Sequence, residues 1–378
     1  MKKISKLLIF VYFGLFPLGQ LTKLPMVWPG VNLYLTDIVV GLLGLLGVLG
    51  RLGKRKEKPP LAKPGLIFIL ICLLSLLINT PRLVVGECLV AGLYLVRLIA
   101  YFGLYLIAYE YRKTIPYKKI LMVVGLTVAV FGLFQYVFWP DTSFLKYLGW
   151  DDHYYRLIGT FLDPGFTGII LVLTLILLIE SKLSIRRYTL IAISYLALAL
   201  TYSRTSYLGL LGGVGAIGIK RKNAKIFLVA VLTVILTLVL LPKKSGGEGV
   251  NLARVSTIEA RIGSWQNAWL IIRKNPLFGV GFNTYRYAQQ KEGLLADDWQ
   301  TNHAAAGVDN SFLFIWATTG IFGLLGLLGL LGKIFHRTWE RSLVAFVTLA
   351  AVLVHSLFTN TLFYPWAMGW LAFILASD

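Results

Sequence analysis

Long apolar runs are the feature of this sequence that most limits how the chain folds. Crossing about 30 Å of hydrocarbon takes about 20 apolar residues, and fewer suffice where glycine-rich helices pack closely. Twelve such runs occur, centred near residues 13, 42, 72, 99, 129, 171, 195, 213, 233, 321, 349 and 370. Only 14% of the residues are charged and 57% are hydrophobic, which excludes a chain of several soluble domains. The sequence therefore predicts an all-α polytopic membrane protein with about 12 transmembrane helices.

Basic residues alternate between the connections that join these runs. Lysine and arginine near short loops are held on the cytoplasmic side of a membrane. The connections on the side of the N-terminus hold 23 basic residues, and those on the opposite side hold 13, of which eight lie within 243–309. Both termini are therefore predicted to be cytoplasmic. The predicted order is transmembrane helices 1–9 in 1–242, one large extracytoplasmic, or periplasmic, loop in 243–309, and transmembrane helices 10–12 in 310–378.

A net charge of +20 is compatible in principle with nucleic acid, anionic lipid or an anionic substrate. Most of the positive charge follows the predicted topology and faces anionic headgroups on the cytoplasmic side. Membrane lipids are thus predicted partners, and nucleic acid is not. The two cysteines form no Cys-x-x-Cys pair, and the sequence has no phosphate-binding loop or His-Glu-x-x-His motif, so no cofactor and no metal are predicted.

The predicted outer loop contains one amphipathic helix. Ser256-x-x-Glu259 has the form of a capping box, which starts helices, and Asn275-Pro276 is typical of a helix end. Five apolar residues recur at spacings of four and three: Ile258, Ile262, Trp265, Trp269 and Ile272. This stripe predicts a helix that lies on the outer membrane surface or on the bundle. Arg261 falls at the margin of the stripe, near the membrane boundary.

Three further arginines on the predicted outer side stand where a helix meets a loop. They are Arg156, Arg204 and Arg286. Arg204 lies in a hairpin of a few residues between two apolar spans, where a guanidinium is costly unless it meets an anion. A guanidinium binds phosphate oxygens through paired hydrogen bonds. Each arginine alone is also explained as a snorkelling anchor, but several around one outer cavity favour a phosphate-bearing ligand.

Two candidate bases precede the tenth span. Asp309-Asn310-Ser311 is typical of a helix N-cap, which explains Asp309 or Asn310 but leaves His303 without a role. A carboxylate and an imidazole can each accept a proton from an incoming hydroxyl. Asp309 and His303 are therefore candidate catalytic residues.

Four short motifs resemble those of the O-antigen ligase and O-antigen polymerase superfamily, bacterial membrane enzymes that move glycans off undecaprenyl diphosphate. They are Arg156-x-x-Gly159-Thr160-Phe161-x-x-Pro164, Ser203-Arg204, Arg261-x3-Trp265 followed by Asn275–Gly281, and Asn310 followed by nine residues and Gly320-x-x-Gly323. The resemblance spans the chain, with twelve spans, both ends inside and a large outer loop before the tenth span. Asp309 stands where the family has a histidine that is regarded as the base.

The resemblance implies a metal-independent inverting glycosyltransferase of the bacterial cytoplasmic membrane. Its donor would be a glycan on undecaprenyl diphosphate, and its acceptor a glycan, lipid or protein hydroxyl. Arginines would neutralise the diphosphate, with Arg204 and Arg261 first and then Arg156 and Arg286. Arg97, Asn310, Trp265 and Tyr285 would support the site. For the missing histidine three explanations stay open: Asp309 is the base, His303 is the base, or activity is lost.

Two other functions fit the same features. A transporter or flippase of lipid-linked glycans would share the number of spans and a basic cavity. Ion-coupled transporters usually carry acids or broken helices at mid-membrane, whereas acids are almost absent from these spans. An inactive structural homologue is the third option. Glycan transfer is the function that the sequence predicts.

Overall fold

The computed structural model describes residues 2–25, 30–50, 59–148, 150–181, 184–242, 248–296, 299 and 307–377, and every regular element in them is helical. The helices are α1 (Lys2–Leu15), α2 (Leu35–Leu49), α3 (Ala62–Asn79), α4 (Val85–Tyr111), α5 (Tyr117–Phe138), α6 (Pro164–Ile179), α7 (Ile185–Leu200), α8 (Arg204–Lys220), α9 (Ala224–Leu240), α10 (Ser256–Lys274), α11 (Tyr285–Lys291), α12 (Ser311–Arg341), α13 (Leu343–Ser356) and α14 (Pro365–Ala376). The all-α prediction is confirmed for these residues.

A helix stands at each of the twelve predicted apolar runs, and α10 and α11 lie in the predicted loop. Among the described residues, five helical segments are long and apolar enough to cross a membrane: Lys2–Thr22, Ala62–Arg82, Val85–Tyr111, Tyr117–Phe138 and Ser311–Arg341. Five shorter apolar helices accompany them, including α9, in which only Val234 is buried. The chain is an integral membrane protein, and the count of twelve crossings stays a prediction.

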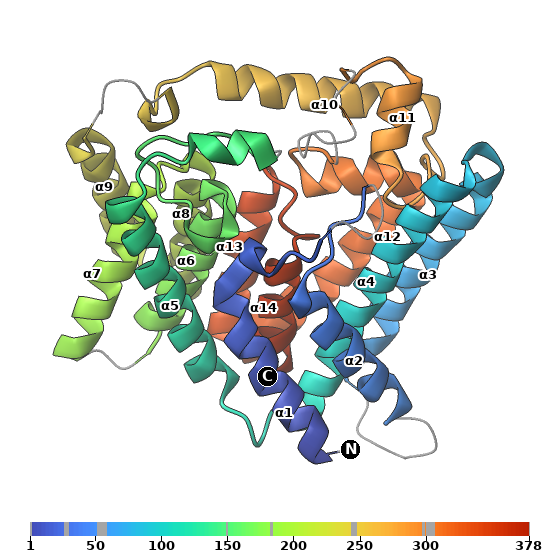
Figure 1. The fold of residues 1–378 in the computed structure, drawn as a ribbon. Helices are drawn as coiled ribbons and strands as arrows, with labels where there is room; N and C mark the ends of the chain where they lie inside the picture. The colour runs from blue at the N-terminus through green and yellow to red at the C-terminus, as the bar shows by residue number, and fades with distance from the viewer. Residues whose placement is uncertain are drawn as a thin grey trace.

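The upright helices form one bundle, and α10 lies across one end of it (Figure 1). The N- and C-termini lie toward the opposite end. We call the end that carries α10 the α10 face. The placement of both termini on the cytoplasmic side of the membrane stays a prediction.

Helices α2 and α4 pack closely because glycines face each other between them. A Cβ on Gly103 would lie 2.6 Å from the Cα of Gly44, and one on Gly47 would lie 2.9 Å from the Gly103 carbonyl oxygen. Such close approach of backbones is usual in membrane helices, where small residues make the interface. Gly44 and Gly47 thus serve packing against α4, whereas an added Cβ on Gly41 would meet nothing within 4 Å.

Helix α12 is interrupted at Gly320, which has φ +68° and ψ −167°. A turn that follows α10 fits into this break: Ile321 donates its N–H to the Pro276 oxygen at 2.9 Å, and Gly281 donates to the Thr318 oxygen at 2.9 Å. The break leaves backbone groups without helical partners, and the turn supplies partners for them. The loop is therefore fixed to the bundle at this point.

Helix α10 begins and ends where the sequence predicts, but its N-terminal cap differs from the prediction. Its N-cap position is Val255, one residue before Ser256, and no side chain caps it, so the predicted capping box does not form. The protein covers the apolar stripe only in part: Ile258 and Ile262 are 45% and 46% exposed, as a helix on the membrane surface allows, while Ile272 is buried. Helix α10 contacts α12, and the buried residues of α10, Ala268, Ile271 and Ile272, lie toward its C-terminal end.

Candidate active site

A cavity of about 1080 Å³ lies at the α10 face. Helices α4, α8, α10 and α11 and the segments before α2, α6 and α12 all contribute to its lining. Within the described part of the chain, the lining includes the arginines Arg97, Arg156, Arg204, Arg254, Arg261 and Arg286. All five arginines singled out from the sequence are among them, so the tertiary structure brings together residues that lie up to 189 positions apart in the sequence.

Arg204 is the first residue of α8, and Ser203 caps this helix by accepting the Ser206 N–H at 3.3 Å. The Arg204 Nη1 donates to the carbonyl oxygens of Leu252 at 3.2 Å and Arg254 at 3.0 Å. Its Nη2 is buried and has no hydrogen-bond partner in the described part of the chain. A buried donor without a partner is costly. Arg204 therefore holds the segment before α10 and keeps one donor unsatisfied.

Arg261 reaches from α10 to the start of α8, where its Nη2 donates to the Thr205 Oγ1 at 2.9 Å. Burial lowers the pKa of Arg261. The neighbouring Arg204 charge acts in the same direction, and the carboxylates of Asp309 and Asp163 oppose it. The guanidinium stays charged at neutral pH because its pKa is so high. Two adjacent positive charges therefore attract an anion.

Arg156 and Arg254 stabilise the walls of the cavity. The buried Arg156 donates through Nε to the Thr201 oxygen at 3.0 Å and through Nη2 to the Tyr202 oxygen at 3.3 Å. Burial and the nearby Arg254 lower its pKa. Arg254 donates to the Gly249 oxygen at 2.7 Å. Arg254 was not singled out from the sequence, because it precedes α10 and belongs to the site only through its burial.

Asp309 lies between α10 and α12 and is held by its backbone. Its N–H donates to the Ser264 Oγ at 3.2 Å, and its carbonyl oxygen accepts the Trp265 indole N–H at 3.2 Å. Burial raises the pKa of the Asp309 carboxyl, Arg261 lowers it and Asp151 raises it. The net direction is upward. A raised pKa makes a carboxylate a better proton acceptor.

The other residues near Asp309 have different roles. Asn310 caps α12, since its Oδ1 accepts the N–H groups of Phe312 at 2.8 Å and Leu313 at 3.0 Å, as the sequence predicts. Trp265 positions the Asp309 backbone. Tyr285 is 1% exposed and does not line the cavity, so in this structure it packs. His303 lies outside the described residues.

A second histidine, His153, lines the cavity and was not singled out from the sequence. Burial together with Arg156 and Arg254 lowers its pKa to about 3, which makes it neutral at pH 7. Its Nε2 is buried and has no partner among the described residues. Nothing in its sequence context, Asp151-Asp152-His153, distinguishes it from an exposed loop, so only its burial against two arginines reveals it.

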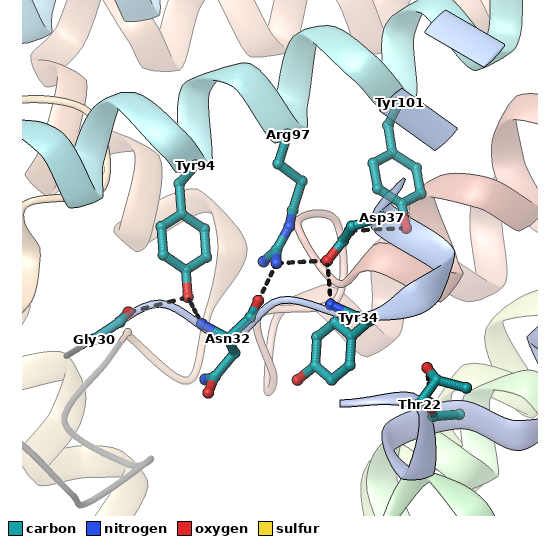
Figure 2. A network of polar contacts seen from close by, with 9 residues as sticks. Thr22, Gly30, Asn32, Tyr34, Asp37, Tyr94, Arg97 and Tyr101 are labelled. Atoms are coloured by element: carbon teal, nitrogen blue, oxygen red, sulfur yellow. Dashed lines mark hydrogen bonds and ion pairs between the residues drawn. The ribbon is translucent and has the colours of Figure 1, made fainter. Parts of the chain in front are cut away.

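Arg97 is paired, as Figure 2 shows. Its Nη2 forms an ion pair with Asp37 at 2.7 Å and also donates to the Asn32 carbonyl oxygen. The Tyr94 hydroxyl lies 3.4 Å from the Gly30 oxygen, and the Asn32 N–H donates to that hydroxyl at 3.5 Å. We call residues 30–34 the strap. Arg97 therefore supports the site by fixing the strap as a cavity wall, and its charge is compensated.

The fold and the site together define an integral membrane protein with an arginine-lined cavity at one end of its helical bundle. Residues 188–328 match the family described as O-Antigen ligase. This match covers part of the chain and supports the resemblance, stated above, to the O-antigen ligase and polymerase superfamily. The matched residues include Arg204, Arg261, Arg286 and Asp309. No curated protein matches the chain.

Proposed function

We propose that the chain transfers a glycan from undecaprenyl diphosphate to an acceptor hydroxyl, with inversion, at the extracytoplasmic face of the bacterial cytoplasmic membrane. The observation that carries this proposal is the pair Arg204 and Arg261 in one cavity with Asp309. Arg204 has a buried donor without a partner, and Arg261 lies in its electrostatic reach. The α10 face is then extracytoplasmic, and both termini are cytoplasmic.

In the proposed reaction the acceptor oxygen attacks the anomeric carbon from the face opposite the diphosphate. The new bond joins the acceptor oxygen to the anomeric carbon. The bond from that carbon to the diphosphate oxygen breaks, and the diphosphate leaves with the electron pair. Asp309 accepts the proton of the acceptor hydroxyl. Burial of Asp309 favours this step, because the raised pKa makes the carboxylate a stronger base.

Arg204 and Arg261 neutralise the charge that develops on the leaving diphosphate. Groups that are held in place before the reaction stabilise such charge without reorganisation during the step. Arg204 is held by two backbone carbonyls and Arg261 by Thr205, so both guanidinium groups are fixed. Arg156 and Arg254 keep the surrounding backbone in place and add positive potential. The neutral His153 adds no charge of its own.

The proposal is tested by reconstituting the purified chain with an undecaprenyl-diphosphate glycan and measuring release of the lipid diphosphate. We expect Arg204→Ala and Asp309→Ala to lose turnover, with His303→Ala as the test of the alternative base. Arg273→Ala is a matched control, because Arg273 lies exposed on α10 over the Trp269 ring. If wild type turns over and both Arg204→Ala and Asp309→Ala keep its rate, the site assignment is wrong.

The alternative function is a transporter or flippase of lipid-linked glycans. It is favoured if no acceptor supports turnover while the labelled glycan crosses the membrane of sealed vesicles. An inactive homologue would do neither. The same vesicles distinguish the three functions, since lipid release and glycan movement are separate signals.

A further inference from the structure

Arg286 lines the cavity from a wall that differs from the one holding Arg204 and Arg261. It is the second residue of α11 and stands beside the strap: a Cβ on Gly30 would lie 3.5 Å from the Arg286 Nη1 and 3.6 Å from the Tyr287 hydroxyl. Figure 1 shows α11 near α3 and α4, whereas α8 lies across the bundle beside α9. The half-buried Arg286 therefore presents its charge on the side of α4 and the strap.

The Arg286 charge has no acidic partner in the described part of the chain. Neighbouring cations on the same side are compensated by carboxylates. These pairs are Lys291 with Glu87 at 3.2 Å, Lys274 with Glu292, and Arg97 with Asp37 at 2.7 Å. Arg286 forms no such pair and no hydrogen bond there. A guanidinium that lines a cavity without an acid is a ready site for an anion.

Uncharged polar groups accompany Arg286 on this wall. The side-chain amide of Asn32 lines the cavity and makes no hydrogen bond with a described residue. In Figure 2 this amide points away from Tyr94 and Arg97, which hold the strap through its backbone. Amides and tyrosine hydroxyls both donate to and accept from sugar hydroxyls. The wall thus combines one cation with groups suited to a carbohydrate.

We propose that this wall is the acceptor subsite and that Arg286 binds an acidic group, a carboxylate or a phosphate, on the acceptor glycan. The inference rests on the proposed transfer reaction, and it separates Arg286 from the diphosphate, with which the sequence had grouped it. The cavity then holds two anions. Arg204 and Arg261 receive the donor diphosphate, and Arg286 receives the acid of the acceptor.

Binding to the full chain in zwitterionic nanodiscs tests this assignment without turnover. The probes are methyl β-glucuronoside, glucose 6-phosphate, methyl β-glucoside and inorganic pyrophosphate, each titrated by calorimetry. The variants are Arg286→Gln, Arg204→Gln and the matched exposed control Arg273→Gln. Thermal unfolding of each variant verifies that it is folded.

We expect Arg286→Gln to weaken binding of the glucuronoside or of glucose 6-phosphate by about 10- to 100-fold, the usual loss for a hydrogen bond to a charged group. Whichever acidic probe loses affinity identifies the anion as carboxylate or phosphate. The glucoside should be unaffected, and Arg273→Gln should behave as wild type. Arg204→Gln should show the reverse pattern, losing pyrophosphate and keeping the acidic sugar.

The inference is overturned if Arg286→Gln weakens pyrophosphate binding instead, because Arg286 then belongs to the diphosphate site. It is also overturned if wild type binds the acidic probes no better than the glucoside, or if Arg286→Gln alters only binding of vesicles that contain anionic lipid. Failure of the proposed function looks different: Arg204→Gln would then keep pyrophosphate affinity, whatever happens at Arg286.

Discussion

Replacing Gly320 by alanine tests how the outer loop is fixed to the bundle. Gly320 has φ +68° and ψ −167°, a region that only glycine occupies readily. An added Cβ would lie 2.1 Å from the Leu277 carbonyl oxygen, which belongs to the turn seated in the α12 break. The substitution therefore strains the backbone and pushes the turn out of the break.

The magnitude follows from two costs. Backbone strain in this region costs about 1–3 kcal/mol, and overpacking costs about 1–3 kcal/mol, so Gly320→Ala should lower the free energy of unfolding by about 2–6 kcal/mol. The assay is denaturant titration of the purified chain in detergent micelles. Gly329→Ala is the control, because nothing lies within 4 Å of its added Cβ. That control should be stabilised by about 0.5–1 kcal/mol, as expected for glycine to alanine inside a helix.

A functional consequence follows because this turn joins α10 to α11. If it is displaced, Arg261 and Arg286 lose their shared support, so Gly320→Ala should also reduce glycan transfer. Equal unfolding midpoints for Gly320→Ala and Gly329→Ala would refute the reasoning. They would mean that the turn and the α12 break are not coupled.

Three further predictions concern charged residues. Burial raises the pKa of Asp309, so the folded chain keeps this proton to higher pH than the unfolded chain and loses stability as the pH rises between the two pKa values. At pH 7, Asp309→Asn should therefore raise the unfolding temperature and abolish glycan transfer. A lower unfolding temperature would contradict this. Arg97→Gln should lower the free energy of unfolding by about 3–5 kcal/mol in denaturant titrations, because it leaves the buried Asp37 charge unpaired. The double variant Arg97→Gln with Asp37→Asn should recover part of this loss. A single variant as stable as the double variant would argue against the ion pair. Arg204→Ala should lower kcat for glycan transfer about 10²- to 10³-fold, while Arg273→Ala should keep the wild-type rate. Similar losses of rate in both variants would indicate a general effect of positive charge and not a specific role of Arg204.

The sequence predicted the positions of the helices well, because a run of apolar residues is a local property. Each of the twelve runs contains a helix, α10 ends at Lys274 before Asn275-Pro276, and Asn310 caps α12. Hydropathy and capping depend on residues within a few positions of one another, and they need no knowledge of the fold. Residue type also identified the arginines, because a guanidinium at the edge of an apolar span is unusual.

Only the tertiary structure decided how these residues are used. Arg97 and Asp37 are 60 positions apart, and their pairing compensates a charge that the sequence left unexplained. Arg254 and His153 entered the site through burial, which no local pattern reveals. Apolar residues on one helical face do not state which neighbour covers them, so only the structure shows that Ile258 and Ile262 stay exposed while Ile272 is buried.

The positions of the apolar helices and the residue type of the arginines therefore follow from local chemistry, whereas the roles of the individual arginines do not. Hydrophobic length and charge type are properties of single segments, so the sequence alone determines them. Whether a guanidinium is compensated depends on which distant carboxylate or carbonyl reaches it, and only the packed bundle sets those distances. For this reason Arg97, Arg156, Arg204 and Arg286 look alike in the sequence and differ in the fold.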